Sequence, residues 1–328
     1  MPRFFPIMEN RVDEFVANPR RALFILAAPI SVAMFVQTMY NIVDTAFVGR
    51  LGAASIAALT FAFPIFFILI SLNSGLGVGI NSIVSRLLGA KNKEGAEIAA
   101  AHGILLTVVL AIVVYILGRL TLEPLYALFG AAQDVRALSK SYMSIVLLAV
   151  LFMFPAYAMN SIFVAQGDTR TPMKIQALGF VLNALLDPIF IYPLRFGVRG
   201  AAIATDIAIG ISLLVYIRFL MKKSYLRVRF RTFRFSIDLC REICRVGAPA
   251  SLMMLTMSIY VMFLNRFMAH FGTDYVASFG LAGRLESFVS LPIFALSISL
   301  LTLVGMFYGA KRYDLVRSIS WYGTVIGL

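Results

Sequence analysis

Long apolar stretches dominate this 328-residue sequence, and they restrict its fold more than any other feature. The chain is 60% hydrophobic and only 14% charged, and its mean hydropathy is +0.88. A helix needs about 20 predominantly apolar residues to cross the hydrocarbon layer of a bilayer. A transmembrane barrel would instead alternate apolar and polar residues over short segments, and this sequence does not. We therefore predict an all-α polytopic membrane protein.

Eight complete spans and the start of a ninth can be placed along the chain. Several exceed the roughly 20 residues that a span requires, so we expect tilted or extended helices. No small-residue cleavage site follows the first apolar stretch, which we interpret as an uncleaved span. The predicted spans are Ala22–Val48, Ser55–Leu88, Ala96–Leu117, Leu138–Val164, Thr171–Pro193, Gly200–Met221, Ile243–His270 and Tyr275–Tyr308, with the ninth beginning near Leu315.

Lysine and arginine gather in alternate connections between these spans. The richest stretch, Lys222–Arg245, holds eight of them, whereas Arg50 is the only one between the first two spans. The positive-inside rule therefore places the N-terminus in the cytoplasm, and the basic stretch is suited to contact anionic membrane lipids. The net charge of +13 does not indicate a nucleic-acid partner, because no basic patch interleaves with exposed aromatic residues.

The sequence repeats itself across this basic stretch. Ala28-Pro29 recurs as Ala248-Pro249 and Gly89-Ala90-Lys91 recurs as Gly309-Ala310-Lys311, in both cases 220 residues later. Repeats of equal orientation are typical of transporters. We predict a leader at 1–21, a six-helix bundle at 22–222, a basic linker at 223–242, and the start of a second, incomplete bundle at 243–328. The second repeat holds two spans and part of a third, so we expect a C-terminally truncated chain.

Two acidic residues lie inside predicted spans, where a charge at the bilayer centre costs ~3 kcal/mol on insertion scales. Asp44 lies in Ala28–Val48 and Asp187 in Ile175–Phe190. Each shares a helix face with polar residues at helical spacing, namely Gln37, Tyr40 and Asn41 with Asp44, and Asn183 with Asp187. These stripes indicate a hydrated cavity that binds a cation or a proton. The alternative is that each carboxylate only bonds a neighbouring helix.

Four ordered motifs resemble the multidrug and toxic compound extrusion (MATE) family, most closely its DinF-like branch. They are Tyr40–Thr45, Gln166–Pro172, Asn183–Pro188 and Gly200–Thr205. The resemblance implies twelve helices in two six-helix bundles around a central cleft, in the cell (inner) membrane. It also implies drug export coupled to inward movement of Na⁺ or H⁺, with no other cofactor.

The same resemblance implies a cation site made of Asp44, Asn183, Asp187 and Thr205. Carboxylate, amide and hydroxyl oxygens suit a hard cation such as Na⁺, and the carboxylates suit a proton equally well. The alternative for Thr205 is a bond to the carbonyl one turn earlier. Another branch of the family carries an acidic residue in the seventh span, but residues 251–265 contain none.

Candidate substrate contacts lie near this site. Met34, Gln37 and Tyr40 share the face of Asp44, and soft methionine and aromatic side chains attract amphipathic organic cations. Asn160 in the fourth span and Asp206 beside Thr205 are further candidates. Ordinary helix packing is the alternative for the first group, and an ion pair with a basic residue is the alternative for Asp206.

Two alternatives to drug export are a lipid flippase and an intramembrane enzyme. A lipid-linked oligosaccharide flippase of the same superfamily would want cationic residues in its cleft, whereas the presumed cavity here is acidic. An intramembrane enzyme would need a motif such as H-E-x-x-H or G-x-S-x-G, and neither occurs. We expect a transporter that acts as a monomer. Cys240 and Cys244 fit packing better than a metal site, and Arg284 and Glu286 need partners elsewhere.

Overall fold

The structure is a computed structural model that describes residues 11–51, 53–128, 133–228, 235–269 and 273–327. Within these ranges the chain forms ten α-helices and no strand, which confirms the predicted all-α class. The helices are α1 (Val12–Ala17), α2 (Pro19–Gly49), α3 (Ala53–Gly89), α4 (Lys93–Leu128), α5 (Gln133–Ala165), α6 (Arg170–Ile191), α7 (Val198–Lys222), α8 (Ile237–Ala269), α9 (Thr273–Gly309) and α10 (Tyr313–Gly327).

Seven of these helices are long and apolar enough to cross a membrane. They are α2, α3 from Ile65, α4 to Pro124, α5 from Ser139, α6, α7 and α9 from Phe288. The α10 helix has 15 residues, and the outer half of α8 includes side chains outside the described set. The molecule is therefore a multi-pass membrane protein.

The 220-residue repeat governs where the helices begin and end. Two helices end at Gly49 and Ala269, two end at Gly89 and Gly309, and two begin at Lys93 and Tyr313. The two positions in each pair are 220 residues apart. The two turns that follow α3 and α9 also share their backbone bonds. Ala90 N–H donates to the Arg86 carbonyl at 3.0 Å, and Ala310 N–H donates to the Met306 carbonyl at 2.9 Å. Each turn then holds a lysine in the left-handed region, Lys91 at φ 56° and Lys311 at φ 59°.

The two repeats are joined by crossed helix pairs: α8 packs along α3, and α9 packs along both α2 and α3. Small residues, Gly75 and Gly79 one turn apart on α3, allow the close approach of α3 and α8. A Cβ on Gly75 would lie 2.6 Å from the Gly247 carbonyl oxygen, and one on Gly79 would overlap the Ile243 carbonyl oxygen. The α2–α9 contact instead buries an aliphatic and aromatic cluster that includes Leu23, Leu26, Leu303, Met306 and Phe307.

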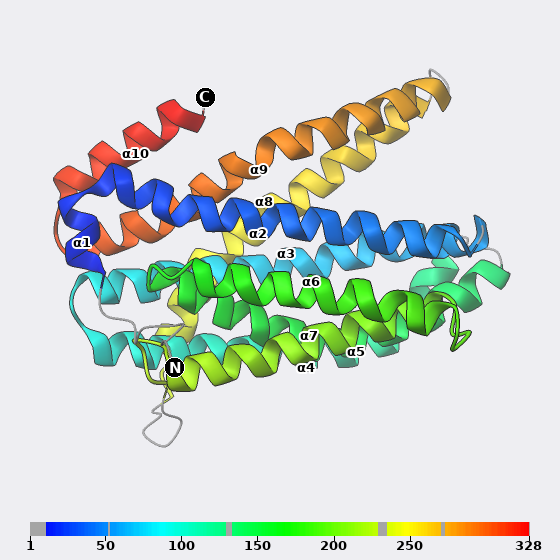
Figure 1. The fold of residues 1–328 in the computed structure, drawn as a ribbon, viewed down its shortest axis with the longest axis horizontal. Helices are drawn as coiled ribbons and strands as arrows, with labels where there is room; N and C mark the ends of the chain where they lie inside the picture. The colour runs from blue at the N-terminus through cyan, green and yellow to red at the C-terminus, as the bar shows by residue number, and fades with distance from the viewer. Residues whose placement is uncertain (1–10, 52, 129–132, 229–234, 270–272, 328) are drawn as a thin grey trace.

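Both contacts lie at the end of the molecule that carries α1, the α3–α4 turn and the α5–α6 turn, which we call the basic end. Figure 1 shows α8 and α9 diverging from α2 toward the opposite end. Apolar side chains of both helices are exposed, with Phe263 at 64% and Val289 at 71%. The repeats are therefore packed together at the basic end and separate at the other.

The short α1 helix adds to the packing at the basic end. Its Phe15 is buried against Gly167 of the α5–α6 turn, where φ is +80°. Arg11 donates to the Gly167 carbonyl at 2.9 Å and also to the Glu14 carboxylate. The hydrogen bond to Glu14 lowers the pKa of the Glu14 carboxyl. Lys91 forms an exposed ion pair with Asp13 at 3.1 Å. The segment before α2 thus contacts turns on the first repeat.

Candidate functional site

The predicted cation-binding residues come from α2, α6 and α7, which pack side by side. A short connection with Gly197 at φ 57° turns the chain back after α6, so that α7 runs antiparallel to it. Gly200 permits close packing there, because a Cβ would lie 2.6 Å from the Phe190 carbonyl oxygen. This close turn brings Thr205 of α7 beside Asn183 of α6.

A chain of hydrogen bonds links the three helices. The Asn183 amide nitrogen donates to Asp187 Oδ1 at 3.1 Å and to Thr205 Oγ1 at 3.2 Å. The Thr205 hydroxyl lies 2.8 Å from the Tyr40 hydroxyl of α2. Asn183 is 1% and Asp187 0% exposed, so these bonds form away from bulk solvent. The structure thus brings together Asn183, Asp187, Thr205 and Tyr40.

Asp44 completes the group electrostatically. It lies one turn after Tyr40 on α2, and its charge acts on both Asp187 and the Tyr40 hydroxyl. Asp44 Oδ1 and Asp187 Oδ2 are buried and have no hydrogen-bond partner among the described residues. A buried carboxylate oxygen without a partner carries a desolvation penalty that a bound cation or proton would relieve.

The Thr205 and Tyr40 hydroxyls together have one proton more than their mutual hydrogen bond uses. Thr205 Oγ1 accepts from Asn183, and only one of Thr205 and Tyr40 can donate across their 2.8 Å contact. The other hydroxyl keeps its proton for a further acceptor, and two carboxylate oxygens nearby lack one. The site can therefore offer both oxygen ligands and a movable hydroxyl proton.

The predicted substrate contacts are spread more widely. Tyr40 belongs to the hydrogen-bonded group just described. Gln37 lies exposed one turn before Tyr40. Met34 is half-buried and packs against the cluster at the basic end. These three residues follow one face of α2 but meet different surroundings along it.

Asn160 and Asp206 lie outside the hydrogen-bonded group. Asn160 of α5 lies near the buried Tyr216 hydroxyl together with Gln176, and Tyr216 is eleven residues, or about 16 Å, along α7 from Thr205. Both carboxylate oxygens of Asp206 are buried and have no partner within the described ranges. The suggested ion pair of Asp206 is therefore not formed by any side chain that the structure describes.

One nearby residue was not singled out by the sequence. Tyr142 of α5 packs near Val198 and Ala201 of α7. It stands in a polar run at the start of its span, between Ser141 and Ser144, and no periodic stripe of polar residues singles it out. Of the two α9 residues for which the sequence required partners, Glu286 is exposed, and the side chain of Arg284 lies outside the described residues.

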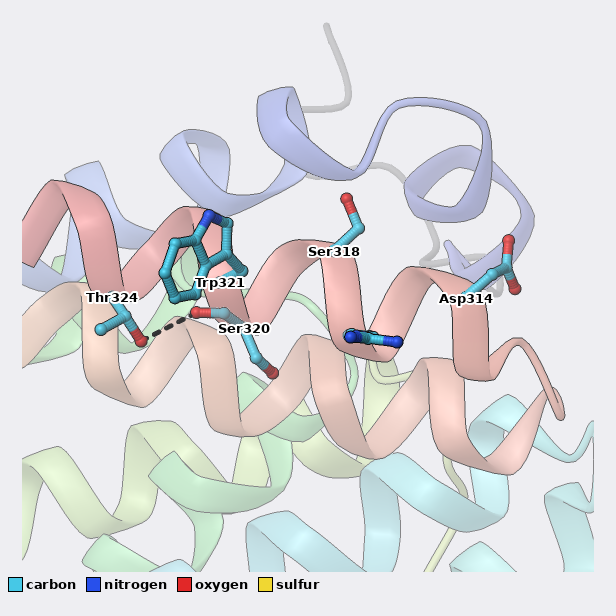
Figure 2. Close-up of a pocket in the computed structure, with 6 residues that line it drawn as sticks. Asp314, Ser318, Ser320, Trp321 and Thr324 are labelled. Carbon is cyan, nitrogen blue, oxygen red and sulfur yellow. Dashed lines mark hydrogen bonds between the residues drawn. The ribbon is translucent and has the colours of Figure 1, made fainter.

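A hollow on α10 lies far from this group. Figure 2 shows its lining, with Thr324 donating to the Ser320 carbonyl at 2.9 Å. All six lining residues, Asp314, Arg317, Ser318, Ser320, Trp321 and Thr324, come from this one helix. Because one helix face supplies every contact and Trp321 is 72% exposed, we assign no ligand to this hollow.

Membrane-length helices built as a repeat in equal orientation, with buried carboxylate and hydroxyl oxygens inside the first repeat, are typical of transporters. The MatE family model matches residues 29–189 and 249–328, which is more than half of the chain. The chain belongs to the MATE family, and it is a transporter and not an enzyme.

Individual relatives agree with this assignment. The chain is 27% identical over 320 residues to the probable multidrug resistance protein YoeA of Bacillus subtilis, covering 94% of this chain and 69% of YoeA. It is 29% identical to a protein named FAD transporter from Shewanella oneidensis, over 93% of this chain and 69% of that one. It is also 28% identical to the multidrug export protein MepA of Staphylococcus aureus, over 91% and 67%.

Solved structures match more closely than these sequences. A multidrug resistance MATE transporter in an outward-facing conformation superposes with a TM-score of 0.93 and 33% identity, covering 97% of this chain and 71% of that one. A MOP superfamily transporter from Pyrococcus furiosus superposes with a TM-score of 0.92, also at 33% identity and with the same coverage.

Proposed function

We propose that this protein is a secondary active exporter that couples efflux of amphipathic organic cations to inward movement of Na⁺ or H⁺. The observation that carries the proposal is the pair of unpartnered buried oxygens, Asp44 Oδ1 and Asp187 Oδ2, beside the Asn183–Thr205–Tyr40 hydrogen bonds. Asp44, Asn183, Asp187 and Thr205 bind the coupling cation. The basic end faces the cytoplasm, in the inner membrane, as the positive-inside rule indicates.

Coupling needs only that the cation and the substrate prefer different states of the two repeats. A cation that arrives from outside neutralises the carboxylates and gives their free oxygens a partner. The Tyr40 hydroxyl passes this change from α6 and α7 to α2, because it is hydrogen-bonded to Thr205. Since α2 also packs on α9, its position influences how the repeats meet at the basic end.

The exposed faces of α2 and α8 support a loosely selective substrate site. Met253, Met257 and Tyr260 of α8 are each more than half exposed, and Phe35 of α2 is 49% exposed. Flexible thioethers and aromatic faces accommodate varied apolar bodies and attract organic cations. The relatives named for multidrug export and multidrug resistance support the same substrate class. Gln37 and Asp206 are the polar contacts that we assign to the substrate, together with Met34, Tyr40 and Asn160.

Ethidium efflux from cells that express the gene tests this proposal under imposed Na⁺ or pH gradients. We expect one of the gradients to accelerate efflux in the wild type, and Asp44→Asn and Asp187→Asn each to abolish that acceleration. An efflux rate that changes with neither gradient would contradict ion coupling. Efflux that remains coupled in both variants would contradict the assigned site.

A further inference from the structure

The short α1 helix contacts both repeats at the basic end. Figure 1 shows it beside the start of α2 and the end of α9, and it packs against both helices. Val12 and Phe15 of α1 are each 1% exposed, and they are buried in one cluster with Val164 of α5 and Met306 of α9. Two apolar side chains of α1 are therefore covered by residues from the first repeat and from the second.

Three residues that are far apart in the sequence meet at the Phe15 ring. A Cβ on Gly167, in the turn after α5, would lie 2.6 Å from Phe15 Cε2 and 3.7 Å from Met306 Cε. Gly167 thus leaves the space that the ring occupies, at a φ of +80° that favours glycine. The pocket for Phe15 has one wall from the first repeat and another from the second.

Met306 is held from its backbone side without any help from α1. Its carbonyl oxygen lies against Gly89 of α3, where a Cβ would not fit. The Thr302 hydroxyl, one turn before Met306, donates to Asn81 of α3 at 3.1 Å. The α3–α9 contact therefore fixes the main chain of Met306, and α1 adds a second contact at the end of its side chain.

Polar contacts attach α1 to two turns of the first repeat. Arg11 donates to the Gly167 carbonyl at 2.9 Å, and its guanidinium carbon lies 4.6 Å from the centroid of the Phe15 ring. Asp13 forms an exposed ion pair with Lys91 in the α3–α4 turn. An exposed pair of this kind contributes little to stability, so Arg11 is the polar residue that positions the ring.

The helical structure of α1 depends on this pocket. The helix has six residues, whereas isolated helices of fewer than about 12 residues are marginal in water. Its main chain is held by bonds from Phe15 N–H to the Arg11 carbonyl at 3.0 Å and from Asn18 N–H to the Glu14 carbonyl at 3.3 Å. We expect both bonds to be lost when the Phe15 ring leaves its pocket.

We propose that α1 is a strap that stabilises the closed state of the basic end. Phe15 is enclosed only while Met306 lies beside Gly167, so the burial of its ring favours the state in which the repeats are packed together here. When the repeats separate at this end, one wall of the pocket is withdrawn and α1 unfolds. The inference goes beyond the proposed ion and substrate, and needs only that the repeats separate at the basic end during transport.

Distances between spin labels across the basic end test the proposal without a transport assay. Glu94→Cys at the start of α4 and Arg317→Cys on α10 are exposed label sites in the two repeats, and neither belongs to the Phe15 cluster. Cys240 and Cys244 are replaced by serine. Distances in the purified protein are recorded with and without ethidium, with and without Na⁺, and in acidic and alkaline buffer.

We expect Phe15→Ala to raise the ratio of long to short Glu94–Arg317 distances roughly tenfold, a small part of what truncation of a buried phenylalanine costs. Phe24→Ala is the matched control, because Phe24 of α2 loses the same atoms but is 48% exposed. It should leave the ratio unchanged. An unchanged ratio in Phe15→Ala would overturn the proposal, as would an equal rise in Phe24→Ala or the absence of long distances from every variant and condition.

Hydrogen exchange separates release of the strap from a general loss of stability. The Asn18 amide closes the last turn of α1, whereas the Ala22 amide, bonded to the Asn18 carbonyl at 2.9 Å, lies in the first turn of α2. In Phe15→Ala the Asn18 amide should exchange roughly tenfold faster while the Ala22 amide keeps its rate. Equal acceleration of both amides, or of neither, would overturn the proposal. Because neither measurement records efflux, failure of the proposed ion coupling would leave both results unchanged.

Discussion

The α2 and α8 helices occupy equivalent places in the two repeats, yet the predicted cation-binding residue Asp44 of α2 has no acidic counterpart at the equivalent position of α8. Tyr40 has its counterpart in Tyr260, but Asp44 is replaced by Leu264 and Gln37 by Met257, each 220 residues later. The Tyr40 hydroxyl is bonded to Thr205, whereas Tyr260 is 56% exposed. The second repeat therefore keeps the helix that carries these positions, but not the acid and the amide found on it in the first repeat.

The neighbours of each helix explain this difference. The α2 helix packs along α6, and α7 brings Thr205 to the same place, so an acid on α2 meets an amide, a hydroxyl and a second acid. Within the described ranges, α8 packs mainly along α3, whose facing residues include Gly75 and Gly79. A carboxylate becomes a cation site only where other helices supply oxygen ligands beside it.

The largest effect on efflux is expected when asparagine replaces, in separate variants, the residues at the two equivalent positions of α2 and α8. Asp44→Asn removes the only charge on that face of α2, and we expect ion-driven ethidium efflux to fall at least about tenfold, as for loss of a metal-site contact. Leu264→Asn places the same side chain on α8 and should leave coupled efflux near the wild-type rate. If Leu264→Asn were as damaging as Asp44→Asn, the chemistry would not be confined to the first repeat.

The glycine contact between α3 and α8 should be the most sensitive point for stability. Gly79→Ala puts a Cβ against the Ile243 carbonyl oxygen, and overpacking of this kind costs about 1–3 kcal/mol. We expect a clear drop in the thermal unfolding midpoint in detergent. Gly210→Ala is the control, since a Cβ there meets nothing within 4 Å. Equal midpoints for the two variants would contradict the close approach of the repeats.

An intermediate effect is expected at Thr205. Thr205→Val keeps the shape but leaves Asn183 and Tyr40 without their shared partner, which costs roughly 1–3 kcal/mol at a buried site. Coupled efflux should fall by about tenfold. Thr205→Ser retains the hydroxyl and should restore most of the rate. A valine variant with the wild-type rate would contradict the role of the hydroxyl, because valine keeps the methyl group and the shape of the side chain.

The smallest effect on stability is expected at the two equivalent turns that follow α3 and α9. Lys311 holds φ at 59°, which costs a non-glycine residue roughly 1–2 kcal/mol. Lys311→Gly should therefore stabilise the fold by up to about 1 kcal/mol in denaturant unfolding, after the added entropy of glycine is subtracted. Lys91→Gly relieves the same strain at φ 56° but also removes the ion pair with Asp13, so its gain should be slightly smaller.

Much of this architecture is predictable because it depends on local patterns. Apolar stretch length predicts the helices, and the identical offset of Pro29 and Pro249 predicts the repeat. The stripes containing Asp44 and Asp187 identify two helices of the site.

The rest depends on how helices are placed relative to one another. Asn160 lies beside Tyr216 and Gln176 because of the axial positions of α5, α6 and α7, which no single-helix pattern encodes. The bonds of the α7–α8 connection are not predictable either, since an irregular segment has no period. His102 accepts from the Ser236 N–H and Gln166 accepts from the Ser224 hydroxyl, and neither pair is marked in the sequence.

The central claim is that Asp44 and Asp187 form one cation site that competes energetically with substrate binding. The most direct test is the Kd of ethidium for the purified protein, measured by fluorescence anisotropy over a series of Na⁺ concentrations and pH values. We expect one of the two cations to weaken ethidium binding by about tenfold in the wild type, within the usual range of coupling between sites. Asp44→Asn and Asp187→Asn should each remove that dependence, while Leu264→Asn retains it. A dependence that persists in both aspartate variants would contradict the account.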